Sequence, residues 1–533
     1  MGKAMIRVNN IQANINVSME RLKEIVSMKT GLDPDNIKKL KIAKKSVDAR
    51  NKSNVHFVYS LDMEVWGDED YIATILAWKD VEQVKETPVL LIKPKPQPKL
   101  RPLVVGSGPA GMFAALALAE AGQNPIIIER GKDVNERQKD VERFWQCGSL
   151  AVNSNVQFGE GGAGTFSDGK LMTGIKKDQY TAKVLQELTA AGAPEEILYL
   201  AKPHIGTDKL VTVVQNIRKR ITALGGEYRF EEQLIGLEVG GGRLQAAKIQ
   251  KADGTIYTLS ADKLILAVGH SARDTFEMLH SAGAAIEQKP FSIGVRIEHL
   301  QSMVDEVQYG RYAGSPQLGA ADYKLAVHLP NGRSAYTFCM CPGGEVVAAA
   351  SEANRVVTNG MSEFARDKAN ANAALLVGVS PADFGGTHPL QGMYWQRELE
   401  AKAFELGGKN YYAPAQLVGD FLAGKASERL GKVSPSYRPG VTLTDLSLLF
   451  PDYVTETLRL AIIEMNRKLK GFANSDAVMT AIETRSSSPI RILRDDTYQS
   501  NIRGLYPCGE GAGYAGGIVS SAVDGLRVCI TEE

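Results

Sequence analysis

The sequence has few cysteines, almost no net charge and no long apolar run. Its five cysteines among 533 residues are an odd number without the spacing of a disulfide framework, which indicates reduced thiols and a cytoplasmic location. The net charge of +1 excludes a strong overall attraction to nucleic acid or to an anionic membrane. No apolar run approaches the roughly 20 residues that span a bilayer, and the N-terminal residues lack the apolar core of a secretory signal. We therefore expect no membrane partner.

Length and composition are those of a globular protein with several domains. A chain of 533 residues exceeds one ordinary hydrophobic core, and its 44% hydrophobic and 23% charged residues are typical of globular proteins. A spacer that alternates proline with basic residues over 94–102 marks one boundary. We expect an N-terminal domain at 1–93, a second domain built from 103–290 and 480–533, and a domain inserted between them at 291–479.

The N-terminal domain has the pattern of two strand–helix–strand halves. The expected strands are 6–17, 37–47, 55–65 and 82–92, and the expected helices are 18–30 and 68–79. This order indicates a ferredoxin-like α+β fold. Six lysines and one arginine lie between Lys38 and Lys52, against the single acid Asp48. A solvated basic face explains them; nucleic acid is the alternative partner, although no aromatic RNA-reading motif accompanies them.

A glycine-rich turn stands between a predicted strand and a predicted helix just after the linker. It reads Gly106-Ser-Gly108-Pro109-Ala110-Gly111. The first glycine permits the tight turn, the second lets the backbone approach a pyrophosphate, and the third lets the helix pack closely on the strand. The N–H groups at the start of the helix would hold the negative charge.

An acidic residue completes this pattern. Glu129 ends the second predicted strand about 20 residues beyond the turn, where a carboxylate accepts hydrogen bonds from both hydroxyls of a ribose. Arg130 follows directly and joins the expected cofactor contacts. The turn and the carboxylate together predict a Rossmann-like dinucleotide-binding domain in an α/β fold, and they leave NAD and FAD open as the ligand.

The end of the chain decides between these two cofactors. Gly509-Glu510 follows a predicted strand at 505–508, and Gly516-Gly517-Ile518 opens a last predicted helix at 516–530. Glu510 can bind the hydroxyls of a ribitol. The N–H groups at the start of the helix can stabilise the pyrophosphate, or the flavin edge that becomes negative on reduction. Because NAD needs no second anchor so far along the chain, we predict non-covalently bound FAD.

Segments between these two motifs agree with FAD. Gly269 ends the predicted strand 264–268 with a small residue, as backbone beside a cofactor requires. The loop 158–171 is rich in glycine, so its backbone can contact a flavin ring; a mobile surface lid is the alternative. We add Leu234, in the predicted strand 234–239, to the expected cofactor contacts.

These motifs resemble the glutathione-reductase-like, two-dinucleotide-fold flavoprotein superfamily, although Glu510 stands where that superfamily ordinarily has Asp and is similar instead to the fumarate-reductase-like branch. As a whole the chain resembles a bacterial family of uncharacterised FAD-dependent dehydrogenases. The segments that carry this resemblance are 159–171, 290–299, 337–344, 483–491 and the C-terminal Gly-Glu segment. The resemblance implies the fold and FAD without a substrate. It also implies that Gly162, Gly164, Thr165 and Lys170 contact the flavin ring.

Four residues are candidates for catalysis. His204 precedes a predicted helix and His270 follows Gly269; an imidazole with a pKa near neutrality suits proton transfer, and a helix cap is the alternative for His204. Arg485 and Arg491 flank three serines before the last strand, where they would hold an anionic substrate or a flavin carbonyl. The alternative is an ion pair with Glu483 or Glu298, and Arg296 is a further arginine that would join either arrangement.

Cys339 and Cys341 are two residues apart on a predicted strand, so both would point to one face. A disulfide between residues i and i+2 is strained, and buried structural thiols are our interpretation. No second Cys or His pair stands at metal-ligand spacing, so we expect no metal site.

The sequence therefore predicts a FAD-dependent oxidoreductase that transfers a hydride through flavin N5 to or from a small, anionic substrate. No second dinucleotide fingerprint marks an NAD(P)H domain, so NAD(P)H would act only as a transient reductant. Two alternatives stay open. One is an RNA-modifying flavoprotein that uses the basic N-terminal domain, and the other is a non-catalytic FAD-binding protein.

Overall fold

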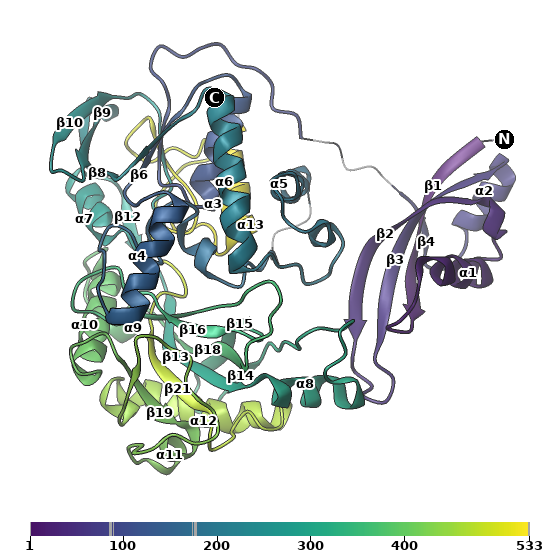
Figure 1. Cartoon of the computed structure of the whole chain (residues 1–533). Helices are drawn as coiled ribbons and strands as arrows, with labels where there is room; N and C mark the ends of the chain where they lie inside the picture. Colours follow the sequence, from purple (N-terminus) through teal and green to yellow (C-terminus); the bar gives the residue numbers. More distant parts are fainter. Residues whose placement is uncertain (1, 85–87, 89, 173, 175–177, 531–533) are drawn as a thin grey trace.

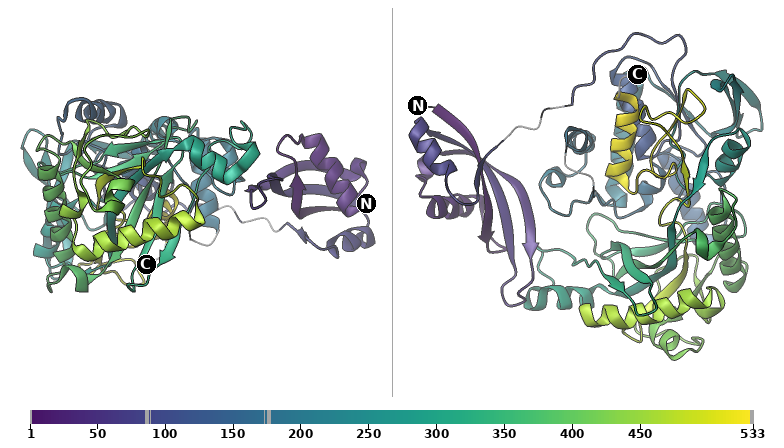
Figure 2. Two further views of the ribbon diagram at one scale, coloured as in Figure 1. Left: turned by 90° about the horizontal axis from the view of Figure 1, so that it is seen from below. Right: turned by 180° about the vertical axis from the view of Figure 1, so that it is seen from behind.

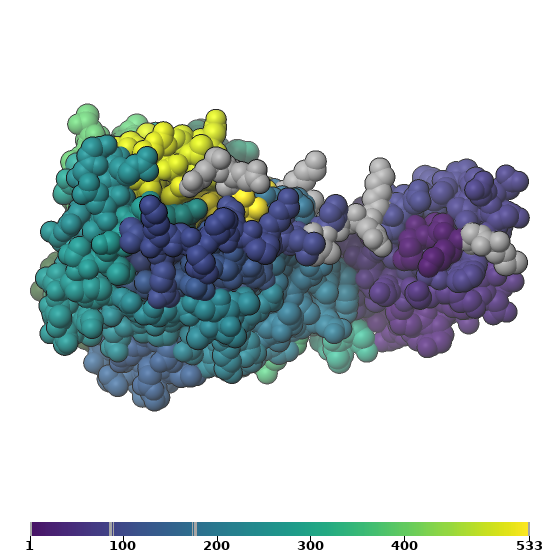
Figure 3. Space-filling model, turned by 90° about the horizontal axis from the view of Figure 1, so that it is seen from above, coloured from purple at the N-terminus to yellow at the C-terminus, as the bar shows by residue number. Residues whose placement is uncertain are grey.

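The computed structural model describes residues 2–84, 88, 90–172, 174 and 178–530. A small N-terminal domain stands beside a larger body whose main sheets have five and seven strands (Figure 1). In the space-filling view the N-terminal domain forms its own lobe at one end of the molecule (Figure 3). Within the described residues, no helix is both long and apolar enough to cross a membrane.

The N-terminal sheet has the antiparallel order β2-β3-β1-β4 of a ferredoxin-like fold. Its elements are β1 (Gly2–Ala13), α1 (Met19–Thr30), β2 (Ile37–Asp48), β3 (His56–Gly67), α2 (Glu69–Leu76) and β4 (Val81–Gln83). Ser18 and Asp68 begin the two helices, because each side chain accepts a hydrogen bond from a first-turn N–H.

Two strands of this domain end well before their predicted ends. The first strand ends at Ala13 rather than 17, because the Asn14 side chain accepts from Asn16 N and its carbonyl from Val17 N, which makes a turn. The last strand ends at Gln83, and part of the predicted remainder, 85–87 and 89, lies outside the described residues.

The hairpin formed by β2 and β3 makes the contact between the N-terminal domain and the body (Figure 2). Lys45 N donates to Tyr199 O and Ala201 N donates to Lys45 O, each at 2.9 Å, so the edge of β2 continues into the body. Lys52 Nζ also donates to the carbonyl of Gln308. Two of the basic residues of 38–52 are therefore part of this contact.

The first sheet of the body is parallel, with the order β23-β11-β5-β6-β7. Its strands are β5 (Leu103–Val105), β6 (Ile126–Glu129), β7 (Glu227–Phe230), β11 (Leu264–Leu266) and β23 (Leu505–Pro507). The central strands are buried on both faces, which is why the sequence shows them as apolar runs without alternation.

Each face of this sheet has its own cover. Val104, Ile127 and Ile265 pack against helices α3 (Pro109–Glu120), α6 (Thr207–Ala223) and α13 (Ile518–Ile530). The alternate residues, such as Leu103 and Val105, pack against α7 (Arg273–Ser281) and the antiparallel sheet β8 (Glu232–Gly240), β9 (Arg243–Lys251) and β10 (Ile256–Ser260). Figure 1 shows α3, α6 and α13 together, with β8–β10 beyond them.

The second sheet of the body has seven strands in the order β14-β15-β18-β13-β21-β19-β20. They are β13 (Phe291–Leu300), β14 (Ala326–His328), β15 (Ser334–Cys341), β18 (Asn370–Val379), β19 (Ala413–Leu417), β20 (Val441–Leu443) and β21 (Val478–Glu483). Helix α12 (Asp452–Lys468) runs along this sheet (Figure 1), and α10 (Gln391–Leu406) packs beside β19 and β21.

Shorter elements complete the body. They are α4 (Val134–Cys147), α5 (Gln179–Ala190), α8 (Gln301–Tyr309), α9 (Pro381–Phe384), α11 (Val418–Ala423), the pair β12 (Ile286–Gln288) with β22 (Ile490–Ile492), and the pair β16 (Glu345–Ala348) with β17 (Thr358–Met361).

A buried carboxylate joins the two halves of the body. Glu400 on α10 is fully buried and accepts two hydrogen bonds from Arg273 of α7, at 2.7 and 2.8 Å, and two from Arg485 after β21, at 2.8 and 3.0 Å. Thr484 Oγ1 donates a further one. The two guanidinium groups hold the pKa of Glu400 far below its usual range against the effect of burial.

Glu400→Gln should therefore destabilise the protein strongly, because the buried Arg485 loses the carboxylate that binds it and Arg273 keeps only Glu352. We expect a loss of about 3–5 kcal/mol in the free energy of unfolding, measured by denaturant unfolding. Glu405→Gln, at an exposed position of the same helix, is the matched control and should change little. Equal stability of the two variants would contradict this role of Glu400.

Candidate functional site

A cavity of about 760 Å³ lies between the carboxyl ends of the parallel strands and the seven-stranded sheet. One wall comes from the segments that follow β5, β6, β11 and β23, together with the loop 157–170. The other wall comes from 322–324, 337–340 and 483–486. Open α/β sheets bind ligands at this carboxyl edge, and the volume is in the range of small-molecule sites.

Most of the residues predicted from the sequence line this cavity. They are Gly106, Gly108, Pro109, Ala110, Glu129, Arg130, Gly162, Gly164, Lys170, Leu234, Gly269, His270, Arg485, Gly509, Glu510, Gly516, Gly517 and Ile518. Gly111, Thr165, His204 and Arg491 lie outside the lining.

The fingerprint glycines are required by close backbone contacts. Gly106 has φ +100°, and a Cβ atom there would lie 2.3 Å from Ala267 O; at Gly111 it would lie 1.9 Å from Gly106 O. Gly111 therefore lets helix α3 pack closely against the fingerprint turn, and it does not line the cavity. Gly108 and Gly162 face each other, since a Cβ at Gly162 would lie 2.9 Å from Gly108 Cα. The start of α3 and the glycine-rich loop are therefore in direct backbone contact, and no side chain caps that helix by a hydrogen bond.

Glu129 is held by backbone amides. Its carboxylate accepts from Ser107 N at 2.8 Å, Gly131 N at 2.9 Å and Gly159 N at 3.0 Å. These bonds join the fingerprint turn, the end of β6 and the glycine-rich loop. Because two carboxylate oxygens offer about four acceptor positions, the side chain retains capacity for a ligand hydroxyl.

Arg137, on α4, holds the glycine-rich loop in place. The sequence analysis did not predict this residue. Its fully buried guanidinium donates to the carbonyls of Asn155, Val156, Gly159 and Glu160, and it lies over the ring of Phe166. The apolar positions of α4 recur with helical spacing, so an arginine on that buried face is the sequence signal that could have found it.

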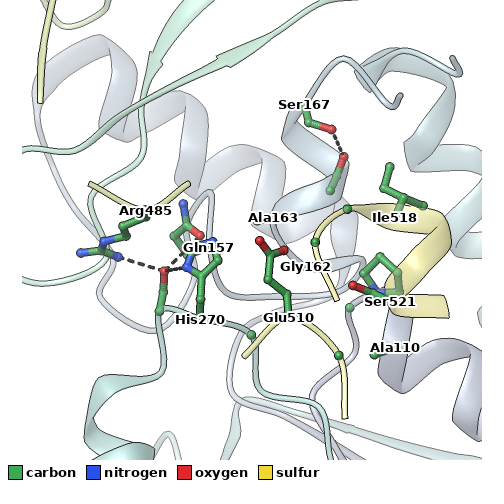
Figure 4. A pocket seen from close by; sticks show the side chains of 18 of the residues that line it. Ala110, Gln157, Gly162, Ala163, Ser167, His270, Arg485, Glu510, Ile518 and Ser521 are labelled. Carbon is green, nitrogen blue, oxygen red and sulfur yellow. Dashed lines mark hydrogen bonds between the residues drawn. The ribbon is translucent and has the colours of Figure 1, made fainter. Parts of the chain in front are cut away.

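The C-terminal turn is held by α13. Asp524 accepts from Gly509 N at 2.7 Å and from both terminal nitrogens of Arg494. The helix begins at Ile518 rather than at the predicted Gly516, because Gly517 has φ +114°. Figure 4 shows the side chain of Glu510 in the middle of the pocket view, with His270 on one side of it and Ile518 on the other.

Glu510 carries an unusual carboxyl group. Burial raises its pKa to about 7, against the opposing effects of Lys289 and of a hydrogen bond from the backbone of Gly517. At neutral pH this carboxyl therefore exists in both protonation states, and it can donate as well as accept a hydrogen bond in the cavity.

His270 and Arg485 meet at Ser271. Ser271 Oγ lies 3.1 Å from His270 Nδ1 and accepts from Arg485 Nη1 at 3.0 Å. Burial, with Arg485 and Arg273 nearby, lowers the pKa of His270 to about 3, so the imidazole is neutral at neutral pH. Arg485 forms an ion pair, as the alternative interpretation of the sequence proposed, but its partner is Glu400 rather than Glu483 or Glu298. The same interpretation describes Arg296, which pairs with Glu483 at 2.7 Å.

His204 and Arg491 make contacts away from the cavity. His204 Nε2 lies 3.1 Å from Phe364 O, and its ring stacks on Phe364. Arg491 lies on β22, where its half-exposed guanidinium is 3.6 Å from Glu287. The sequence does not reveal these positions, because each depends on a partner from a distant segment.

The two cysteines of β15 differ in position. The pairing of β15 with β18 shifts between Phe338 and Cys341, and Cys339 has φ +42°. This bulge interrupts the regular alternation of side chains, and a hydrogen bond still joins the two thiols. Cys339 lines the cavity, whereas Cys341 is fully buried. Among the described residues, no three His, Cys, Asp or Glu side chains are grouped as metal ligands.

Arg137→Lys should weaken FAD binding, because an ammonium cannot hold four carbonyls in the fixed geometry of a guanidinium. We expect at least a tenfold higher Kd for FAD, about 1.4 kcal/mol, by titration of flavin fluorescence. Arg143→Lys, at an exposed position of the same helix, should bind FAD as the wild type does. Equal affinities would show that the loop does not depend on Arg137.

Glu510→Gln should stabilise the FAD-free protein at pH 8. Because the folded pKa of about 7 lies above the ordinary 4.5, the proton-linked stability is complete below about pH 4.5 and is lost as pH rises through 7. Glu510→Gln has no such group to ionise, so at pH 8 its free energy of unfolding should exceed that of the wild type by up to about 3 kcal/mol. Thermal unfolding at several pH values tests this; exposed Glu287→Gln is the control. A constant difference between wild type and Glu510→Gln from pH 4.5 to 8 would be incompatible with the raised pKa.

Three family models match parts of the chain. A FAD binding domain matches residues 101–138, and the family described as FAD-dependent protein, C-terminal domain-like, matches residues 290–486. A domain of unknown function matches residues 5–64. The first match covers the fingerprint turn and Glu129, which line the cavity.

Solved structures with a similar fold include a geranylgeranyl bacteriochlorophyll reductase-like protein from Thermoplasma acidophilum. It is 14% identical, with 80% of this chain and 76% of that chain covered and a TM-score of 0.33. Glycerol-3-phosphate dehydrogenase from Bacillus halodurans, complexed with FAD, is 12% identical, with 80% and 63% covered and a TM-score of 0.34. These scores are too low to carry a function to this chain.

A relative covers the whole length. An uncharacterised protein of Clostridium beijerinckii is 48% identical over 528 residues, which are 98% of this chain and 97% of that protein. The chain belongs to the same family as this Clostridium protein, and it is a FAD-dependent flavoprotein.

Proposed function

We propose that the chain is an oxidoreductase that exchanges a hydride between its bound FAD and a small anionic substrate in the cavity. The observation that carries this proposal is that one cavity joins both halves of the body. One wall has the predicted FAD contacts, and the other wall, from the seven-stranded sheet, has side chains that FAD binding does not require. Bound FAD supplies a ring whose N5 accepts or gives a hydride.

The residues of the first wall fit FAD. Gly108 and Gly162 allow the two backbones to touch, and the first N–H groups of α3 have no side-chain cap, so these N–H groups can receive a pyrophosphate. Glu129 would accept from ribose hydroxyls, and Glu510 would bind the ribitol. The start of α13 would face the pyrophosphate or the flavin edge.

The second wall favours an anionic substrate with an apolar part. Lys324 and the exposed side chain of Phe338 belong to it, and Lys170, Lys202 and Met172 line the cavity beside it. Lys202 is paired with Asp322, at 2.6 Å. Arg485 is committed to Glu400, so lysines rather than arginines supply the positive charge that a substrate would meet.

The proposal extends to the domains and the superfamily. Residues 103–290 and 480–533 would form the FAD-binding domain, 291–479 the substrate domain, and 1–93 a separate ferredoxin-like domain. The order of the glycine motifs along the chain supports membership of the glutathione-reductase-like superfamily. His270 is neutral at neutral pH and would accept or donate one hydrogen bond, whereas Glu510 would hold or release the proton that accompanies a hydride.

Anaerobic stopped-flow mixing tests the oxidoreductase. We expect the visible absorption of oxidised FAD to bleach with NADH, NADPH or a small organic anion as the donor, and to return when an oxidised acceptor is added. Dithionite is the control that shows the flavin to be reducible. If dithionite bleaches the flavin and none of the biological donors does, the result would favour a non-catalytic FAD-binding protein.

A further inference from the structure

The N-terminal domain packs on the body through the hairpin of β2 and β3. Residues 49–55 form the tip of this hairpin, which lies beside α8 (Figure 1). Val55 at the tip is buried in the hydrophobic core that also contains Tyr309 and residues of the seven-stranded sheet. The hairpin is therefore part of the body's own packing. FAD binding and hydride transfer, as proposed above, do not use it.

One side of this contact fixes the backbone next to Lys202. Ala201 N donates to Lys45 O at 2.9 Å, and Leu171 N donates to Pro203 O at 2.9 Å. The first bond joins the segment to the N-terminal domain, and the second joins it to the glycine-rich loop. Lys202, which lines the cavity, therefore lies between two backbone pairings.

The tip of the hairpin fixes the backbone of Asp322. Lys52 Nζ donates to Gln308 O, and Gln308 Nε2 donates to Asp322 O at 2.8 Å. Arg311 Nη2 adds a hydrogen bond to Ser53 O at 2.6 Å. The hairpin thus holds the end of α8, and α8 holds the chain at Asp322.

Lys202 and Asp322 form an ion pair where the cavity meets solvent. Lys202 Nζ lies 2.6 Å from Asp322 Oδ1, and the two side chains, which both line the cavity, are 62% and 25% exposed. Ile205 belongs to the core against the parallel sheet, whereas Tyr323 belongs to the core of the seven-stranded sheet. The pair therefore joins the two halves of the body across the mouth of the cavity, by which we mean its exposed end at Lys202, Asp322 and Lys324.

The mouth carries more positive than negative charge. Lys324 is exposed, lines the cavity and has no ion pair with any residue that the structure describes. An exposed ion pair contributes little to stability, so an incoming carboxylate can replace Asp322 at Lys202 at low cost. Because the backbone on both sides of Lys202 is anchored, Lys202 stays at the mouth when the pair opens.

We propose that the N-terminal domain controls which small molecules enter the cavity. Its hairpin holds Lys202 and Asp322 across the mouth, and Lys202 exchanges Asp322 for the carboxylate of an incoming organic acid, without forming a covalent bond. Lys202 determines specificity, while Lys45 and Lys52 are positioning residues. The inference deepens the proposed function, since it rests on the cavity as the reaction site and names small carboxylates as the class that enters.

Two alkylating reagents of similar size test the selection in the FAD-loaded, full-length protein. Iodoacetate is a small carboxylate, and iodoacetamide is its neutral counterpart. Both react with thiols, and Cys339 lines the cavity. Cys147→Ser removes the exposed thiol and is the background for every variant. The ratio of the two rates at Cys339, followed by tandem mass spectrometry, cancels the reactivity of the thiol itself and reports how charge affects entry.

Lys202→Met should lower the ratio of the iodoacetate rate to the iodoacetamide rate by about threefold or more. Asp322→Asn should raise it by a similar factor, because Lys202 then has no competing carboxylate, and both effects should shrink at high salt. Lys402→Met, at an exposed position outside the lining, has the same change in net charge and should keep the parent ratio. A ratio that neither mouth variant changes, or no alkylation of Cys339 by either reagent, would overturn the proposal.

Lys45→Pro tests the part played by the N-terminal domain. The N–H and the carbonyl of Lys45 both bond to the body, so proline removes a bond to the body while β2 remains paired with β3. Lys45→Ala keeps both backbone groups and is the matched control. Lys45→Pro should speed the reaction with iodoacetamide and lose the selectivity for iodoacetate, because Lys202 is no longer held.

Equal rates for Lys45→Pro and Lys45→Ala with both reagents would show that the N-terminal domain does not control entry, and would overturn the proposal. Alkylation does not read the redox state of the flavin. Failure of this inference is therefore distinguishable from failure of the oxidoreductase function.

Discussion

The candidate site depends on the close packing of α13 against α3. A Cβ atom at Gly525 would lie 2.1 Å from Ala110 O, so the two helices touch at a point where no side chain fits. The strands before these helices lie in the same parallel sheet. The turn after β23 and the fingerprint turn after β5 therefore open into one cavity, although the whole of the second sheet comes between them in the sequence.

Buried ion pairs hold the wall of the cavity that includes 483–486 in place. Glu400 binds Arg273 and Arg485, and Glu483 binds Arg296, with every partner almost fully buried. Such pairs are costly to break because a lone charge would remain in the interior. They explain why Arg273, Arg296 and Arg485 are structural.

Strong local patterns were predictable, and contacts between distant segments were not. Apolar runs indicated the parallel strands, and the glycine motifs indicated which turns line the cavity. Helix α4 was missed, and with it Arg137, whose partners are loop carbonyls that a sequence does not display. The bulge at Cys339 depends on strand register, and the pairing of Arg485 with Glu400 depends on how α10 packs against the segment after β21. Neither can be derived from spacing alone.

The central claim is that motifs from both ends of the chain together hold one FAD. The most direct measurement is to denature the purified protein and to identify and quantify the released nucleotide by chromatography and mass spectrometry. The account predicts FAD, released without a covalent bond, at close to one molecule per chain. FMN or NAD in its place, or a protein that binds no FAD when the nucleotide is supplied, would contradict it.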